Sequence, residues 1–196
     1  MKRCWWCGDD ALYVRYHDVE WGVPVTEDIV LFEKLALEGF QAGLSWITIL
    51  RKRERFREVF QGFSPDRVAA FRERDLQRLL RDPGIIRHRG KIEAVIGNAR
   101  AYRELVAREG SLARFAWSFA PALPRVPRAR GDIPAQTVES EAFSKELKRR
   151  GWRFVGPTTA YAFFQAMGLV NDHLADCHRQ SAVATLRARV LASGVR

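Results

Sequence analysis

The chain has 196 residues, enough for one hydrophobic core or two small lobes that share a cleft, and we expect one compact unit over 1–196. It has no apolar run of membrane-spanning length and does not begin with the apolar stretch of a signal peptide, which favours a cytoplasmic protein without membrane contacts. Its formal net charge of +10 favours a polyanionic partner, because arginine and lysine side chains exchange their counterions for phosphates.

Apolar residues recur at helical spacing along the chain and no segment alternates as a strand does, so we expect an all-α fold. A first helix is predicted near 10–17, and a second begins after an N-cap at Thr26. The apolar stripe of this second helix comprises Ile29, Phe32, Leu35 and Ala36. Later helices are expected at 65–71, 75–80, 90–108, 111–117, 138–150 and 157–167. The tail 179–196 is expected to be a helix with a frayed end, and the proline- and arginine-rich segment 120–137 a basic surface loop.

The stretch 37–46 is expected to be a short break that joins two core helices. Ser45 is the expected N-cap of the following helix, whose apolar face comprises Trp46, Ile49, Leu50 and Phe56. Glu38 supplies a carboxylate and Trp46 an indole, which together suit a pocket for a flat, cationic heterocycle. The alternative is that Trp46 belongs to the core and Glu38 is a solvated helix end.

Cysteine and histidine residues near the two ends of the chain predict a metal site. His173 and Cys177 stand four residues apart, so one helical turn would present both to the same side, and Cys4 and His17 could complete a closed Cys2His2 zinc site. Such a site would be structural and would join the termini. Two alternatives remain: Cys7 competes for a ligand position, or the thiols and a histidine are simply buried. His88 and His178 are not expected to be ligands.

The stretch 153–161 predicts a hairpin whose backbone N–H groups open the next helix, a suitable place for a DNA phosphate. The residues expected at that phosphate are Gly156, Thr158 and Thr159. An ordinary connection between two helices is the alternative. A rival hairpin lies at 82–87, followed by a basic cluster, and either hairpin or both could contact the backbone of a duplex.

The chain carries many short motifs in a fixed order. They are Cys4, Tyr13 to His17, Glu20-Trp21-Gly22-Val23-Pro24, Leu37-Glu38-Gly39, Gln41 to Thr48, Gly84 to Lys91, Ile96-Gly97-Asn98-Ala99-Arg100-Ala101-Tyr102, Trp117-Ser118-Phe119, Phe154-Val155-Gly156 and Val170-Asn171-Asp172-His173. From the first residues to about Cys177, this pattern resembles the bacterial 3-methyladenine DNA glycosylase I family. The resemblance implies a helix-hairpin-helix glycosylase fold with two helical lobes around a cleft. It also implies excision of 3-methyladenine from alkylated DNA.

The resemblance implies roles for particular residues. Zinc would be held by Cys4, His17, His173 and Cys177. The base pocket would be formed by Glu38 with Tyr16 and Trp46 on the two faces of the base, and walled by Trp6, Tyr13 and Trp21. The wedge that fills the gap in the DNA stack would be Leu44 with Gln41 and Gly43. The hairpin would be the one at Gly156.

Three departures from the superfamily pattern concern the chemistry and the hairpin. Thr158 stands where bifunctional members carry a lysine, so no Schiff base and no strand cleavage are expected. The usual catalytic aspartate is not clearly present, since the nearest candidate, Asp172, adjoins a zinc ligand. Of the two hairpin glycines only Gly156 remains, with Phe154 at the other position.

We therefore expect a monofunctional, monomeric DNA glycosylase that acts on double-stranded DNA carrying alkylated bases and releases free 3-methyladenine. Two alternatives come from other functional classes. A non-catalytic helix-hairpin-helix module would bind DNA without releasing a base. A zinc-dependent hydrolase would need an open coordination position on the metal.

Overall fold

The computed structural model describes residues 1–123 and 125–195, and every regular element within these ranges is a helix. The predicted all-α fold is therefore confirmed. The elements in chain order are η1 (Trp5–Cys7), α1 (Ala11–Val19), α2 (Asp28–Gln41), α3 (Trp46–Leu50), α4 (Arg53–Val59), η2 (Gln61–Phe63), α5 (Pro65–Ala69), α6 (Glu73–Arg81), α7 (Arg89–Glu109), α8 (Leu112–Trp117), η3 (Arg130–Asp132), α9 (Val138–Arg149), α10 (Pro157–Ala166) and α11 (Gln180–Ser193). None of these helices combines the length and the apolar character needed to cross a membrane.

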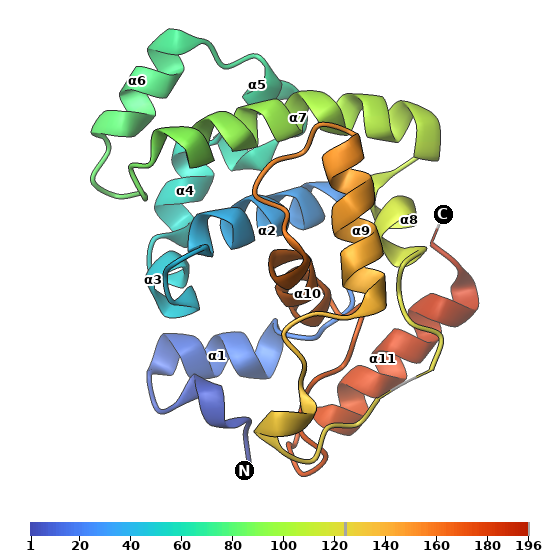
Figure 1. Cartoon of the computed structure of the whole chain (residues 1–196). Helices are drawn as coiled ribbons and strands as arrows, with labels where there is room; N and C mark the ends of the chain where they lie inside the picture. The colour runs from blue at the N-terminus through green and yellow to red at the C-terminus, as the bar shows by residue number, and fades with distance from the viewer. Residues whose placement is uncertain (124, 196) are drawn as a thin grey trace.

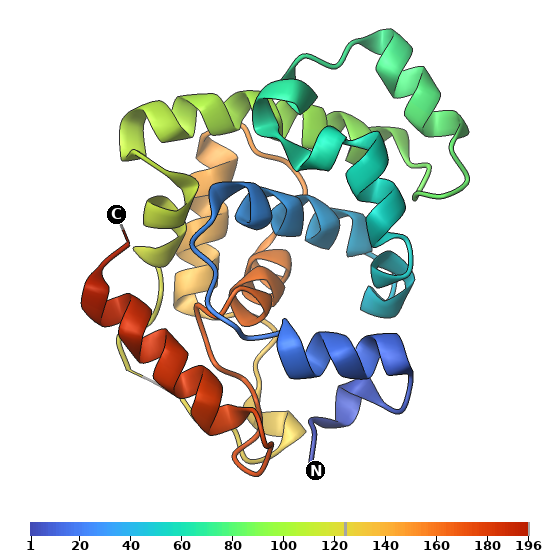
Figure 2. The same ribbon diagram turned by 180° about the vertical axis from the view of Figure 1, so that it is seen from behind.

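Helix α2 lies at the centre of the molecule, between α7 on one side and α10 on the other (Figure 1). Its buried side chains include Leu31, Phe32, Leu35, Leu37 and Phe40. Helix α1 lies beyond the end of α10, and the N-terminal residues run beside the segment that precedes α11 (Figures 1 and 2). A backbone hydrogen bond from His178 N–H to the Lys2 carbonyl, 3.0 Å long, joins these two segments. The N-terminal residues are thus held against the segment that precedes α11.

The start of α2 differs from the prediction. Its N-cap is Glu27 instead of Thr26, and Ile29 is 49% exposed instead of facing the core. The reason is that Asp28 turns inward. Its carboxylate accepts hydrogen bonds from the N–H groups of Leu112 and Ala113 at the start of α8, at 2.9 and 2.8 Å, and from the Tyr102 hydroxyl at 2.7 Å. With Asp28 facing α8, the neighbouring Ile29 points to solvent.

The predicted break at 37–46 is also shorter than expected. Helix α2 continues through Glu38 to Gln41, so only 42–45 form the turn. Gly39 therefore lies inside the helix, where an added Cβ would stand 3.3 Å from the Cβ of Phe154. The helix expected after Ser45 is interrupted at 51–52 and forms α3 and α4. Its predicted apolar residues Trp46, Ile49, Leu50 and Phe56 are all buried.

The remaining predicted helices are present as α1 and α5 to α11, with ends shifted by a few residues at most. In the basic segment 120–137 the only regular element among the described residues is the short η3, and Pro124 lies outside the described residues. The predicted tail helix is α11, and Arg196 lies outside the described residues. Arg187 anchors α11 by donating a 2.8 Å hydrogen bond to the Leu169 carbonyl.

Candidate functional site

An aromatic cavity of about 230 Å³ lies where α1, the start of α3 and α10 meet. Its lining residues are Trp5, Trp6, Tyr13, Tyr16, Trp21, Gln41, Trp46, Ile133, Ala162 and Gln165. They include every aromatic residue predicted for the base pocket. The rings pack against one another: the Trp6 centroid lies 5.0 Å from that of Tyr13 and 4.9 Å from that of Trp21. Such a recess presents ring faces and edges to a flat ligand.

Glu38 is buried at 5% exposure beside this cavity, so it is not a solvated helix end. It does not line the open space. Instead its Oε1 atom lies 2.8 Å from the Nζ atom of Lys34, one helical turn earlier on α2. The carboxylate and the ammonium form a buried ion pair, which is stable only when both charges are well partnered.

Lys34 has the environment that the sequence predicts for a cationic ligand. Its Nζ atom donates a 3.0 Å hydrogen bond to the Tyr16 hydroxyl and lies 3.1 Å from the centroid of the Trp46 ring. Burial lowers the pKa of Lys34, whereas the charge of Glu38 opposes that shift. The sequence analysis missed Lys34. The available signal was a lysine on the apolar face of α2, four residues before the carboxylate.

Tyr16 and Trp46 do not stand apart as the two sides of an open slot. Their ring centroids are 5.4 Å apart and the planes are inclined by 44°. A base stacked between two rings needs about 7 Å, twice the usual contact distance between carbon atoms. The Trp46 indole N–H is also buried without a hydrogen-bond partner among the described residues. A base sandwiched between these rings therefore requires them to separate.

The turn 42–45 presents the predicted wedge residues at the end of α2. Leu44 is 43% exposed, and Gly43 has a φ of +81° with open space around it. The turn is held in place by Lys91, whose Nζ atom donates to the carbonyls of Phe40 and Ala42, at 2.9 and 2.6 Å. A buried ammonium thus satisfies carbonyl groups at the C-terminal end of α2. The consequence is a rigid turn with an exposed aliphatic side chain.

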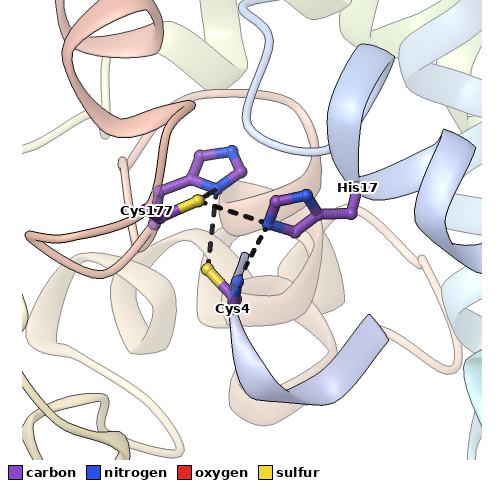
Figure 3. Close-up of side chains that lie close together, drawn as sticks. Cys4, His17 and Cys177 are labelled. Carbon is purple, nitrogen blue, oxygen red and sulfur yellow. Dashed lines mark hydrogen bonds between the residues drawn. The ribbon is translucent and has the colours of Figure 1, made fainter. Parts of the chain in front are cut away.

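The four predicted metal ligands meet in one buried cluster (Figure 3). One ligand atom from each of Cys4, His17, His173 and Cys177 lies within 4.8 Å of the others, so the group could hold a metal ion. The Cys177 sulfur lies 3.5 Å from Nε2 of His17 and 3.4 Å from Nδ1 of His173. Residues 173–177 form turns and not the predicted helical turn, with the Cys177 N–H donating to the Leu174 carbonyl at 2.8 Å.

The inner nitrogen of each histidine ring faces the cluster, and that of His17, Nε2, also accepts a 3.3 Å hydrogen bond from the Cys4 N–H. The Nδ1 atom of His17 lies 2.8 Å from the Asp18 carboxylate, and Nε2 of His173 lies 3.0 Å from the Trp21 carbonyl. Each acceptor fixes the proton on the outer nitrogen. Burial lowers the pKa of His173 to about 4, so its ring is neutral at physiological pH. Burial also raises the pKa of Cys4 to about 12, so its thiolate form needs a cation beside it.

The other candidates for ligand positions lie outside the cluster. The Cys7 thiol points to the Cys4 carbonyl at 3.2 Å and does not compete for a ligand position in this structure. His88 is the N-cap of α7 and accepts a 3.2 Å hydrogen bond from the Lys91 N–H. His178 lies nearer, with Nε2 3.4 Å from the Asp18 carboxylate that orients His17.

The hairpin between α9 and α10 has the geometry expected for backbone N–H donors. Gly151 ends α9 with a φ of +83°, Gly156 is the N-cap of α10, and Pro157 is its first residue. Phe154 has a φ of +56°, in the left-handed region that favours glycine. Its ring lies edge-on to His88, at 6.2 Å between centroids, which helps to hold this conformation. Thr158 is exposed and Thr159 is half-buried, so both can reach an external ligand.

The rival hairpin at 82–87 is tied into the protein. The Asp82 carboxylate accepts a hydrogen bond from the Gly84 N–H at 2.8 Å and pairs with Arg55 at 2.7 Å. Lys52 donates to the Pro83 carbonyl at 3.0 Å. These contacts hold the turn against Lys52 and Arg55.

Asp172 is buried at 2% exposure and does not line the aromatic cavity. Its carboxylate accepts hydrogen bonds from the Tyr161 hydroxyl at 2.5 Å, from Gln165 at 2.8 Å and from Arg125 at 3.2 Å. Gln165, which the sequence analysis missed, connects this network to the cavity. A larger cavity of about 510 Å³ lies beside α11, and its acidic lining residues are Glu139 and this same, already paired Asp172; its lining holds one aromatic residue, Tyr161. The aromatic cavity is therefore the better candidate site.

Comparisons with known proteins agree with the motifs and the fold. The sequence model described as methyladenine glycosylase matches residues 6–180. DNA-3-methyladenine glycosylase 1 of Escherichia coli K12 is 54% identical over 179 residues, which are 90% of this chain and 96% of the relative. A crystal structure of 3-methyladenine DNA glycosylase I superposes with a TM-score of 0.87 at 52% identity, covering 90% of this chain and 98% of the other.

A further solved structure contains a ligand. It is Y16F of 3-methyladenine DNA glycosylase I in complex with 3-methyladenine, 37% identical with a TM-score of 0.87, covering 92% of this chain and 98% of the other. The match of the family model and the identity to curated relatives extend over almost the whole chain. This chain therefore belongs to the methyladenine glycosylase family.

Proposed function

We propose that this protein is a monofunctional DNA glycosylase that rotates 3-methyladenine out of alkylated double-stranded DNA and hydrolyses its N-glycosidic bond. The observation that carries the proposal is a buried carboxylate, Glu38, beside a cavity lined by six aromatic residues. Membership of the family, and a related enzyme solved with 3-methyladenine, support the same substrate. The products are free 3-methyladenine and an abasic site.

The charge of the substrate lowers the chemical demand on the protein. Alkylation at N3 makes the base cationic, so the base departs as a neutral molecule with the electron pair of the broken C1′–N bond. Water then supplies the oxygen that bonds to C1′ and releases its proton to solvent. Little or no general acid is needed, which fits the position of Asp172 away from the cavity. The site must mainly bind and orient the extruded base.

Glu38 is the recognition residue in this scheme. Its carboxylate accepts hydrogen bonds from the base and favours a cation over neutral adenine, since electrostatic attraction is strong at a site shielded from water. Tyr16 and Trp46 stack on the base, while Trp6, Tyr13 and Trp21 form the walls of the pocket.

DNA contacts are proposed on two exposed turns. Leu44, with Gln41 and Gly43, fills the space left in the stack when the base is extruded. The helix-hairpin-helix element around Gly156 holds the DNA backbone through N–H groups and the hydroxyl groups of Thr158 and Thr159. Contacts of this kind ignore base sequence, as a search for damaged bases requires. The protein is proposed to act as a monomer.

We propose that the Cys2His2 cluster holds one structural zinc ion. Tetrahedral zinc, with bonds of about 2.3 Å to sulfur and about 2.0–2.1 Å to nitrogen, places these ligand atoms about 3.6 Å apart. The observed sulfur–nitrogen separations of 3.4, 3.5 and 3.7 Å agree with that geometry. Four protein ligands leave no open position for water, so the ion stabilises the fold and is not a hydrolytic centre.

The test is to incubate the protein with methylated duplex DNA and identify the released bases by chromatography. Wild-type protein should release 3-methyladenine, and Glu38→Gln should reduce that release by about 100-fold or more, on the scale of a lost transition-state contact to a charged group. Glu104→Gln, which makes the same chemical change at an exposed position of α7, is the control. DNA binding by the wild type without release of any base would support a non-catalytic module instead.

A further inference from the structure

We propose that Lys34 is an internal competitor for the base: its ammonium group occupies the binding position on Trp46 and Glu38 and must leave before a base can enter. This inference rests on the proposed function, because it assumes that the ligand is a methylated purine. It adds a residue that controls how tightly the pocket holds its ligand.

The contacts of Lys34 match those assigned to the base. The Nζ atom lies 2.8 Å from Glu38 Oε1, 3.0 Å from the Tyr16 hydroxyl and 3.1 Å from the centroid of the Trp46 ring. The ammonium therefore uses the carboxylate and the two aromatic residues that are assigned to the base. A stacked purine needs about 3.5 Å above the face of the Trp46 ring, which the ammonium already fills. The two cations cannot occupy the position together.

The side chain of Lys34 is suited to exchange with a ligand. A lysine head group is a point charge on a flexible four-carbon stem, so it can withdraw without unwinding the helix that carries it. Tyr16 and Trp46, which the ammonium contacts, also line the aromatic cavity, so the position of the ammonium adjoins that cavity. In the free protein the ammonium keeps Glu38 paired, and in the complex the cationic base takes its place. The buried carboxylate has a positive partner in both states.

The reaction itself shifts this competition. Before cleavage the base carries a positive charge and competes with the ammonium for Glu38 as one cation against another. After cleavage the base is neutral and its attraction to the carboxylate weakens, whereas the lysine stays charged. The ammonium of Lys34 then displaces the neutral base and pairs with Glu38 again. The expected consequence is weak binding of the free product.

The test measures binding of free 3-methyladenine by calorimetry and its inhibition of base release from methylated DNA. Lys34→Met removes the ammonium and keeps an unbranched apolar side chain, so it should bind the free base at least 10-fold more tightly than the wild type. The inhibition constant should fall by the same factor. Lys145→Met, at an exposed position of α9, removes one positive charge away from the pocket and should leave both values unchanged.

Lys34→Met leaves a buried carboxylate without its partner and could therefore fail to fold. A second variant keeps the test possible in that case. Lys34→Gln keeps a neutral donor for Glu38 and should bind the base more tightly than the wild type, by a smaller factor. Equal or weaker binding by both variants would overturn the proposal, since it would mean that Lys34 supports the fold or contacts the base. If the wild type releases no base, the proposed function fails as well. If it does release base while the variants bind no more tightly, only the role of Lys34 fails.

Discussion

Replacing Glu38 by alanine is expected to destabilise the fold as well as abolish base release. The substitution leaves the Lys34 ammonium buried without its carboxylate partner, at a position that is only 5% exposed. Breaking a buried ion pair by removing one partner costs about 3–5 kcal/mol. We expect about 3 kcal/mol, because Lys34 keeps its hydrogen bond to Tyr16 and its contact with the Trp46 ring. For a chain of this size that is a fall of about 6–12 °C in Tm.

Two related variants separate the stability effect from the chemical one. Glu38→Gln keeps an amide oxygen that accepts a hydrogen bond from Lys34. Its free energy of unfolding should therefore fall by only about 1 kcal/mol, while base release is still lost. The double variant Glu38→Ala with Lys34→Met removes both charges and should be more stable than Glu38→Ala alone. Urea denaturation of the variants measures these differences. If Glu38→Ala unfolds at the same urea concentration as the wild type, the reasoning from a buried ion pair is wrong.

The remaining predictions concern the metal cluster, the wedge and the hairpin. Metal analysis of purified protein should find about one zinc per chain, and Cys177→Ser should lose the metal and lower the Tm; a fully folded, metal-free wild type would contradict the site. Leu44→Ala should slow base release from duplex DNA while the free energy of unfolding stays within about 0.5 kcal/mol of the wild type, because the side chain is half exposed. Lys91→Met should lower that free energy by about 2 kcal/mol or more and slow release as well, since it removes two hydrogen bonds that fix the turn. Borohydride should trap no protein–DNA adduct, because Thr158 offers no amine; an adduct would show lyase chemistry from another residue.

Local pattern was sufficient for most of the helices and for naming the four residues of the buried cysteine and histidine cluster. Helical spacing of apolar residues depends only on neighbours along the chain, so α1, α5 to α10 and the tail helix α11 could be placed from the sequence. The pairing of Cys4 and His17 with His173 and Cys177 was also predicted, although these residues approach one another through turns and not on one helical face. The order of the motifs along the sequence identified the family without any structural information.

Only the tertiary structure decided what surrounds the site. The inward turn of Asp28 depends on N–H groups 84 and 85 residues away, and it is this contact that leaves Ile29 in solvent. The contact of Lys34 with Tyr16 joins two helices, and Gln165 reaches the cavity from α10. Helical spacing places Glu38 next to Lys34 on the same helix, but it does not show that Tyr16 and Trp46, from other elements, complete the surroundings of the ammonium. The sequence therefore determined which groups were available, and packing between distant segments determined which of them are paired.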